Sequence, residues 1–322
     1  MKIVPAILST LLLATATTIA TAQADTTGSE HALRIADPTI YPYKGTYYLF
    51  GTNDHNSSNG FIGYQSKDLQ HWQVFTALTK GAAFGTKGFW APQVFQYRKK
   101  FYMAYTANEK IAIAVSDKPT GPFTQTTIQP LDTAVQQIDP YVFIDDDGKV
   151  YLYHVRLQRG NRIFVAEMKD DLSAIKDSTL TFCISGAEAG QDWENTKDVP
   201  WSVTEGPTVV KRNGKYYMFY SANDFRNPDY AVGYAVADNP YGPWQKYADN
   251  PIISQKTLGI PGTGHGDLYT GKKGELWYVL HTHNNASKTG PRKTAIIKVA
   301  FVPGLGPDKV VADPATFKYI QE

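Results

Sequence analysis

The sequence has little cysteine, no marked excess of either charge and few signs of helix. Its one cysteine, Cys183, excludes an intrachain disulfide and a metal cluster built from cysteines. Lys and Arg number 32 against 30 for Asp and Glu, a formal net charge of +2, so the chain lacks the basic excess expected of a nucleic-acid-binding protein. Hydrophobic residues make up 42% and charged residues 19% of the 322 residues, which excludes a disordered chain and indicates a folded core.

A long apolar run occurs only at the N-terminus. Residues 1–24 begin with a single charge on Lys2, continue with the apolar run from Ile3 to Leu13, and end in small residues. Ala22-Gln23-Ala24 matches the pattern that precedes a signal cleavage site. A membrane anchor is the alternative, for which the run is marginal in length. We therefore predict a signal peptide over 1–24, a single domain over 25–322, and a periplasmic or extracellular protein with no membrane association after cleavage.

The rest of the chain repeats one pattern of short apolar and aromatic runs broken by Gly, Asp, Asn and Lys, which is typical of strands and tight turns. Each unit contains a hairpin with an aromatic second strand, followed by further strands. The hairpins occupy residues 39–52, 94–107, 141–155, 208–224 and 268–283, and the units begin at intervals of 49 to 66 residues. This period predicts an all-β, five-bladed β-propeller with four-stranded antiparallel blades. A β-sandwich would not keep the same internal phase five times, and the coils of a β-helix would be shorter.

The longest interval contains an insertion over 185–203, which is polar, rich in turn residues and carries Trp193 and Trp201. It directly precedes the fourth unit. A long ordered loop in a compact domain is often functional. We expect the two tryptophans, together with Trp90, to wall a pocket rather than an open groove, so that only the end of a substrate chain enters. The alternative is that the loop packs against the side of a blade.

The five units open with similar short segments: Ala36-Asp37-Pro38, Trp90-Ala91-Pro92, Ile138-Asp139-Pro140, Glu205-Gly206-Pro207 and Gly264-His265-Gly266. Because the first strand of each propeller blade lines the central axis, equivalent openings should surround one mouth of the channel. We therefore expect five residues from these openings to converge on one pocket: Asp37, Trp90, Asp139, Glu205 and His265.

Three carboxyl groups in one aromatic pocket cannot share one pKa, because like charges close together raise at least one of them. A carboxylic acid with a raised pKa can protonate a leaving-group oxygen, and an ionised carboxylate can activate water. This pair of groups performs glycoside hydrolysis. The alternative for each aspartate by itself is a turn residue that only accepts backbone N–H groups.

These segments resemble glycoside hydrolase family 43, the five-bladed propeller arabinofuranosidases, β-xylosidases and arabinanases. The matching stretches are residues 36–52, 88–107, 138–154, 204–221 and 262–269. The resemblance implies an inverting mechanism in which Asp37 is the general base, Glu205 the general acid, and Asp139 the residue that tunes and orients that acid. It also implies that Trp90 walls the sugar subsite and that Arg292 contacts a pentose hydroxyl.

The resemblance implies no required cofactor. It allows a calcium ion at the channel centre near His265, held largely through water, although calcium prefers oxygen ligands. The alternative for His265 is a hydrogen-bonded channel histidine.

We expect a secreted hydrolase that removes a terminal pentose, first of all α-L-arabinofuranose, from an arabinose- or xylose-containing polysaccharide or oligosaccharide. A β-xylosidase and an endo-arabinanase are the alternatives within the family. A non-catalytic sugar-binding propeller is the alternative from another class, which would have no need for three acids in the same phase of the repeat.

Overall fold

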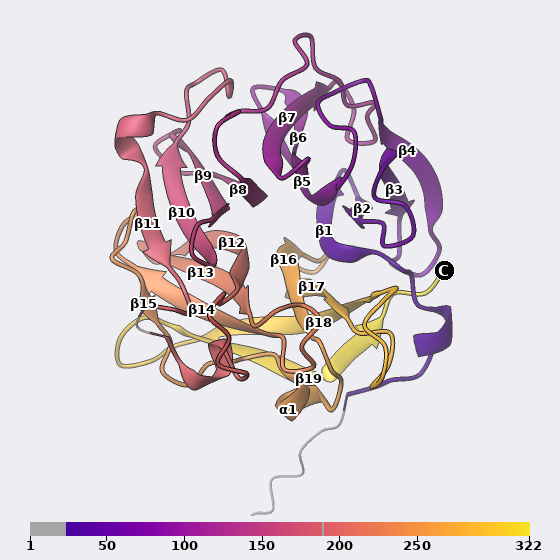
Figure 1. The fold of residues 1–322 in the computed structure, drawn as a ribbon. Coiled ribbons are helices and arrows are strands. Elements are labelled where there is room, and N and C mark those ends of the chain that lie inside the picture. Colours follow the sequence, from indigo (N-terminus) through magenta and orange to yellow (C-terminus); the bar gives the residue numbers. More distant parts are fainter. Residues whose placement is uncertain (1–23, 189) are drawn as a thin grey trace, which may run out of the picture.

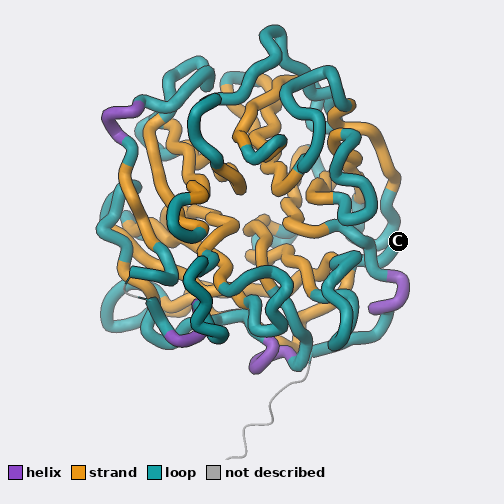
Figure 2. The backbone as a smooth tube through the Cα atoms, in the orientation of Figure 1, coloured by secondary structure: helices purple, strands orange, loops and turns teal. Residues whose placement is uncertain are grey.

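The computed structural model describes residues 24–188 and 190–322, so most of the predicted signal peptide lies outside the described residues. The described chain forms five antiparallel sheets around a central axis, with the first strand of each sheet next to the axis (Figure 1). Nearly all of it is strand or loop, and helix is confined to a few short turns (Figure 2). The prediction of a five-bladed propeller is confirmed.

The first three sheets follow the chain in order. The first contains β1 (Ala36–Tyr43), β2 (Thr46–Thr52), β3 (Gly60–Ser66) and β4 (Gln73–Thr79). The second contains β5 (Trp90–Tyr97), β6 (Lys100–Ala107) and β7 (Lys110–Ser116). The third contains β8 (Gln137–Ile144), β9 (Val150–Leu157), β10 (Asn161–Glu167) and β11 (Thr181–Ile184).

The last two sheets complete the ring. The fourth contains β12 (Thr204–Arg212), β13 (Lys215–Ala222), β14 (Ala231–Ala237) and β15 (Gln245–Lys246). The fifth contains β16 (Gly264–Thr270), β17 (Leu276–Thr282), β18 (Lys293–Val302) and β19 (Lys309–Tyr319). The helical elements are η1 (Ser29–His31), η2 (Asp177–Thr179), η3 (Asp192–Glu194) and α1 (Gln255–Leu258). Among the residues that the structure describes, no helix is long and apolar enough to cross a membrane.

The second blade is the least regular. Four sheets have four strands, but this one has three, and a single bridge between Val115 and Thr124 stands in place of a fourth strand. The segment that returns to the bridge contains Pro119 and Pro122. Proline has no N–H to donate to a ladder, which accounts for the short pairing.

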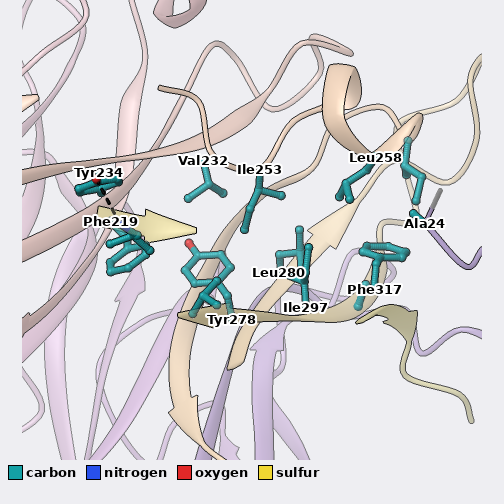
Figure 3. Packing of buried hydrophobic residues seen from close by; sticks show 14 of the residues in the cluster. Ala24, Phe219, Val232, Tyr234, Ile253, Leu258, Tyr278, Leu280, Ile297 and Phe317 are labelled. Atoms are coloured by element: carbon teal, nitrogen blue, oxygen red, sulfur yellow. Dashed lines mark hydrogen bonds between the residues drawn. The ribbon is translucent and has the colours of Figure 1, made fainter. Parts of the chain in front are cut away.

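The aromatic second strands pack between neighbouring blades. Phe219 on β13 and Tyr278 on β17 are fully buried, and their rings stack with centroids 5.8 Å apart. They belong to a cluster between the fourth and fifth blades that also contains Leu280 and Phe317, and in which Ala24 is buried as well (Figure 3). The tyrosine-rich runs of the sequence therefore supply interblade packing.

The segment before β1 closes the ring by bonding to the last blade. The Leu33 N–H donates to the Ile320 carbonyl at 2.8 Å, and the Thr294 N–H donates to the Leu33 carbonyl at 2.9 Å. The side chains of Leu33 and Ile320 are both buried in one cluster. Residues from the two ends of the described chain thus hold the first and fifth blades together.

Closure through Ile320 gives a stability prediction. Ile320→Ala should lower the free energy of unfolding by about 2–5 kcal/mol, because it removes buried methyl groups and leaves a cavity where the ends meet. Leu305→Ala, in the fully exposed tip between β18 and β19, is the control and should change it by less than about 0.5 kcal/mol. Denaturant unfolding followed by tryptophan fluorescence measures both. Equal effects of the two changes would contradict a role for Ile320 in closure.

Candidate active site

Seven of the eight residues predicted from the sequence line one pocket of about 460 Å³ at the mouth of the central channel. They come from every blade and from the insertion: Asp37, Trp90, Asp139, Trp201, Glu205, His265 and Arg292. Residues that the sequence analysis did not single out also line it, among them Asp54, Asn161 and Phe225. The structure therefore brings together groups that are up to 255 positions apart in the chain.

A β-bulge in the first strand of each blade explains how consecutive side chains reach the same pocket. The register shifts at the same place in all five first strands. The bulged residues all have positive φ: Asp37 (48°), Ala91 (42°), Asp139 (53°), Gly206 (58°) and His265 (37°). In a regular strand neighbouring side chains point to opposite faces, but here Ile138 and Asp139 both line the pocket.

The bulge corrects one expectation from the sequence. We expected the five converging residues to occupy one equivalent position of the repeat. The strand register instead places Trp90 opposite Thr106 and Glu205 opposite Ser221, one residue before the bulge. Asp37, Asp139 and His265 occupy the bulge itself. The convergence holds, but it uses two adjacent positions of the repeat.

Each bulge is held by the neighbouring blade. In four blades the N–H of the bulged residue donates to a side chain near the end of the second strand of the preceding blade in the ring. The pairs are Asp37 to His281 Nδ1 (3.1 Å), Ala91 to Thr52 Oγ1 (3.0 Å), Asp139 to Thr106 Oγ1 (3.0 Å) and His265 to Ser221 Oγ (2.8 Å). In the third blade the matching residue is Val155, which pairs with Ile138 and offers no acceptor. The Gly206 N–H donates instead to Asp139 Oδ2 at 3.2 Å. The Asp139 carboxyl is thereby fixed beside the fourth blade.

Asp37 is surrounded by donors. Arg292 Nη1 donates to its Oδ1 at 2.9 Å, and the Thr52 hydroxyl donates to its Oδ2 at 2.6 Å. Burial by itself would raise the pKa of Asp37, but the charge of Arg292, with smaller contributions from His265 and His281, holds that pKa well below its usual value. Asp37 is therefore an ionised carboxylate at neutral pH.

His281 is neutral beside this carboxylate. Burial is the main cause that lowers the pKa of His281 to about 4. Its Nδ1 accepts the Asp37 N–H, so the ring proton lies on Nε2. Stacking on the Tyr230 ring, with centroids 5.6 Å apart, fixes the plane of the imidazole.

Asp54 clamps Arg292. Its two oxygens accept Arg292 Nε at 3.1 Å and Nη2 at 2.8 Å, and Oδ2 also accepts the Arg292 backbone N–H at 2.8 Å. The ring of Phe225 lies 4.8 Å from the guanidinium carbon. The guanidinium thus has a fixed plane, with Nη1 directed at Asp37.

Among the described residues Glu205 has no cationic hydrogen-bond donor, and its pKa shifts in the opposite direction to that of Asp37. The Tyr230 hydroxyl donates to its Oε1 at 2.9 Å and the Asn161 amide to its Oε2 at 2.8 Å, both neutral donors. Burial outweighs these bonds and raises the pKa of Glu205 to about 7. Burial, together with the charges of Glu205 and Asp37, also raises the pKa of Asp139 well above its usual value. One pocket therefore combines one carboxyl group of lowered pKa with two carboxyl groups of raised pKa.

The residues missed by the sequence analysis share one topological feature. In an up-and-down antiparallel sheet, the start of the first strand, the end of the second and the start of the third lie at the same edge. Asp54 follows β2, Asn161 begins β10, Tyr230 precedes β14 and Arg292 precedes β18. Arg292 was predicted from the sequence. The same position at the start of the other third strands could have identified Asn161 and Tyr230.

The two tryptophans of the insertion have different places. Trp201 lines the pocket, and its Nε1 donates to Asn161 Oδ1 at 2.9 Å. Trp193 packs on the Tyr220 ring, 5.7 Å away, donates to Gln191 and borders a separate groove. The expectation that both tryptophans wall the pocket is therefore wrong for Trp193, because η3 turns its ring against β13.

Three of the described side chains could share a metal ion. Asp139, Glu205 and His265 each offer a ligand atom, and these atoms lie within 4.8 Å of one another. The set contains one nitrogen, whereas calcium prefers oxygen, and both carboxyls already accept hydrogen bonds from protein donors. Direct ligation by these acids therefore fits calcium poorly, and we propose that a calcium ion near His265 would be held through water.

The electrostatic contrast gives a titration prediction. The carboxyl carbon of Glu205 should titrate near pH 7, whereas Asp37 should stay ionised from about pH 4 to pH 8, since Arg292 stabilises its charge. Carbon-13 NMR of labelled carboxyl groups measures both, and Glu205→Gln identifies the Glu205 signal. The assignment is wrong if Asp37 takes up its proton at a higher pH than Glu205.

Comparisons with known proteins show which family of sequences the chain resembles. Residues 31–304 match the sequence model described as Glycosyl hydrolases family 43. A crystal structure described as endo-1,4-β-xylanase from Bacteroides thetaiotaomicron is 42% identical, with a TM-score of 0.81 over 88% of this chain and 95% of that chain. The β-xylosidase of Xylanibacter ruminicola is 27% identical over 77% of this chain and 86% of its own length. Xylosidase/arabinosidase 43A of Humicola insolens is 29% identical over 65% of this chain and 77% of its own length.

Proposed function

The chain belongs to glycosyl hydrolases family 43, and on that premise we propose that it removes a terminal pentose from a plant polysaccharide or oligosaccharide with inversion at the anomeric carbon. The observation that carries this proposal is the pairing, in one pocket, of an ionised Asp37 with a Glu205 whose pKa is raised to about 7. Inverting hydrolysis needs these two protonation states on opposite sides of the scissile bond.

In the proposed mechanism Asp37 is the general base. It accepts a proton from a water molecule while the water oxygen attacks the anomeric carbon. Arg292, clamped by Asp54, keeps Asp37 ionised and directs its free lone pairs. Because the guanidinium is held on two sides, it can also donate to a sugar hydroxyl without losing its orientation.

Glu205 is the general acid of the same step. It gives its proton to the glycosidic oxygen as the carbon–oxygen bond breaks, and the leaving alcohol departs with that proton. The reaction leaves Asp37 protonated and Glu205 ionised, and exchange of one proton with solvent restores both. Burial, with the charge of Asp37 as a smaller cause, disfavours early loss of the Glu205 proton. Asp139, which accepts the Gly206 N–H beside Glu205, orients the acid.

We propose α-L-arabinofuranosides as the first substrate class and β-D-xylosides as the second. The pocket, with Trp90 and Trp201 in its wall, suits a chain end, and the formal net charge of +2 suits neutral side chains rather than an acidic backbone. The second class is favoured by the relatives named β-xylosidase and xylosidase/arabinosidase. Secretion is proposed from the signal-like residues 1–24.

Product analysis tests the substrate and the stereochemistry. Incubation with debranched arabinan, arabinoxylan and xylo-oligosaccharides should release single pentoses from the first minutes. Proton NMR of a nitrophenyl pentoside digest should detect the inverted anomer before mutarotation. Early mixed oligosaccharides with little free pentose would indicate an endo-acting enzyme, and initial release of the retained anomer would contradict the roles of Asp37 and Glu205.

Variants of the two acids test the roles. Glu205→Ala should lower kcat about 10²- to 10⁴-fold on substrates with weakly acidic leaving groups, and much less on dinitrophenyl glycosides, which need little protonation. Asp37→Ala should lower kcat by a similar factor on both substrate types, because each needs an activated water. Steady-state kinetics on matched aryl glycosides measures these losses in kcat. The assignment is contradicted if the loss on weakly acidic leaving groups, divided by the loss on dinitrophenyl glycosides, is the same for Glu205→Ala and Asp37→Ala.

A further inference from the structure

Two consecutive hydrogen bonds join Trp201, at the rim of the pocket, to Glu205 through Asn161. Trp201 is 49% exposed, yet its indole N–H is directed inward and donates to Asn161 Oδ1 at 2.9 Å. Asn161 is only 8% exposed, and its Nδ2 donates to Glu205 Oε2 at 2.8 Å. An aromatic ring open to solvent is thereby connected through one buried amide to a carboxyl group in the site.

Trp201 fixes the orientation of the Asn161 amide. An indole N–H can only donate a hydrogen bond, so the Asn161 oxygen must face Trp201 and the Asn161 NH₂ must face Glu205. Without the indole donor, the amide is free to turn over and present its oxygen to Glu205. An amide oxygen there would accept the proton of Glu205 and hold it away from a substrate.

The backbone around Asn161 is built for this contact. The Asn161 N–H donates to the Ser202 carbonyl at 2.9 Å, and Asn161 forms a parallel bridge with Val203. Gly160 has a φ of 123°, and a Cβ at this position would lie 2.7 Å from the Ser202 oxygen. Only glycine lets the segment that carries Trp201 approach β10 so closely.

We propose that Asn161 is a positioning residue for Glu205 and that Trp201 both locks the Asn161 amide and binds the sugar of the leaving group on its exposed ring. The proposal rests on the proposed function, in which Glu205 protonates the glycosidic oxygen. Because that oxygen belongs to the leaving group, residues joined to Glu205 at the rim lie on the leaving-group side. The ligand class is a neutral sugar ring of the polysaccharide, whose apolar face stacks on indole.

Two substitutions at Trp201 separate these roles. Trp201→Phe keeps a ring but removes the N–H, so kcat should fall about tenfold on aryl pentosides with weakly acidic phenols and less than about twofold on dinitrophenyl pentosides. KM for a pentose-substituted oligosaccharide should stay within about twofold. Trp201→Ala should give the same loss in kcat and, in addition, raise that KM about tenfold.

Trp193→Phe is the matched control, because Trp193 belongs to the same insertion but donates to Gln191 outside the pocket. It should match the wild type on every substrate. Asn161→Ala should reproduce the leaving-group pattern of Trp201→Phe, and the double variant should add no further loss. Asn161→Ala therefore tests the same positioning role if Trp201→Phe does not fold.

The inference is overturned if Trp201→Phe equals Trp193→Phe on all aryl pentosides, or lowers every rate by the same factor. A different result is expected if the proposed hydrolase function itself is wrong. In that case the wild type hydrolyses no pentoside, or Glu205→Gln is as active as the wild type. An inactive Glu205→Gln together with a Trp201→Phe variant that behaves like the control refutes the positioning role alone.

Discussion

The candidate active site depends on a positive-φ bulge that is repeated in the first strand of every blade. A regular strand would direct alternate side chains away from the axis, and Glu205 and Asp139 could not then line the same pocket from adjacent positions of the repeat. Four of the five bulges use residues with a side chain, a conformation that costs about 1–3 kcal/mol each. The hydrogen bond from each bulge N–H to the neighbouring blade offsets part of that cost and ties the site to the closed ring.

The second constraint is charge balance within the pocket. Arg292 is the fixed cation beside three buried carboxyl groups, and it is bonded to Asp54 and Asp37 rather than to Glu205 or Asp139. Asp37 can therefore ionise at low cost, whereas burial and neighbouring negative charge raise the pKa values of Glu205 and Asp139. The same functional group, a carboxyl, thus acquires different acidity from different neighbours within one pocket.

Hydrogen-bond donors around Glu205 refine this picture. Tyr230 and Asn161 are neutral, so they hold the carboxyl in place without the strong stabilisation that Arg292 gives to Asp37. Both come from the start of a third strand, the same edge that supplies Arg292. First strands thus supply the three carboxyl groups of the pocket, and the starts of third strands supply side chains that donate hydrogen bonds to Glu205 and Asp37.

The sequence by itself determined the number of blades, the aromatic interblade strands and the group of acids at the openings, because a local hydrophobic pattern that recurs at a fixed interval dictates the same fold each time. Tertiary structure alone decided which tryptophan of the insertion reaches the pocket, since the packing of Trp193 on Tyr220 and the hydrogen bond from Trp201 to Asn161 are both contacts with distant strands. It also decided that Asp54, Asn161 and Tyr230 surround the acids. Their contacts span blades or long stretches of chain, and a one-residue bulge changes which side chains face the axis without altering the hydrophobic repeat.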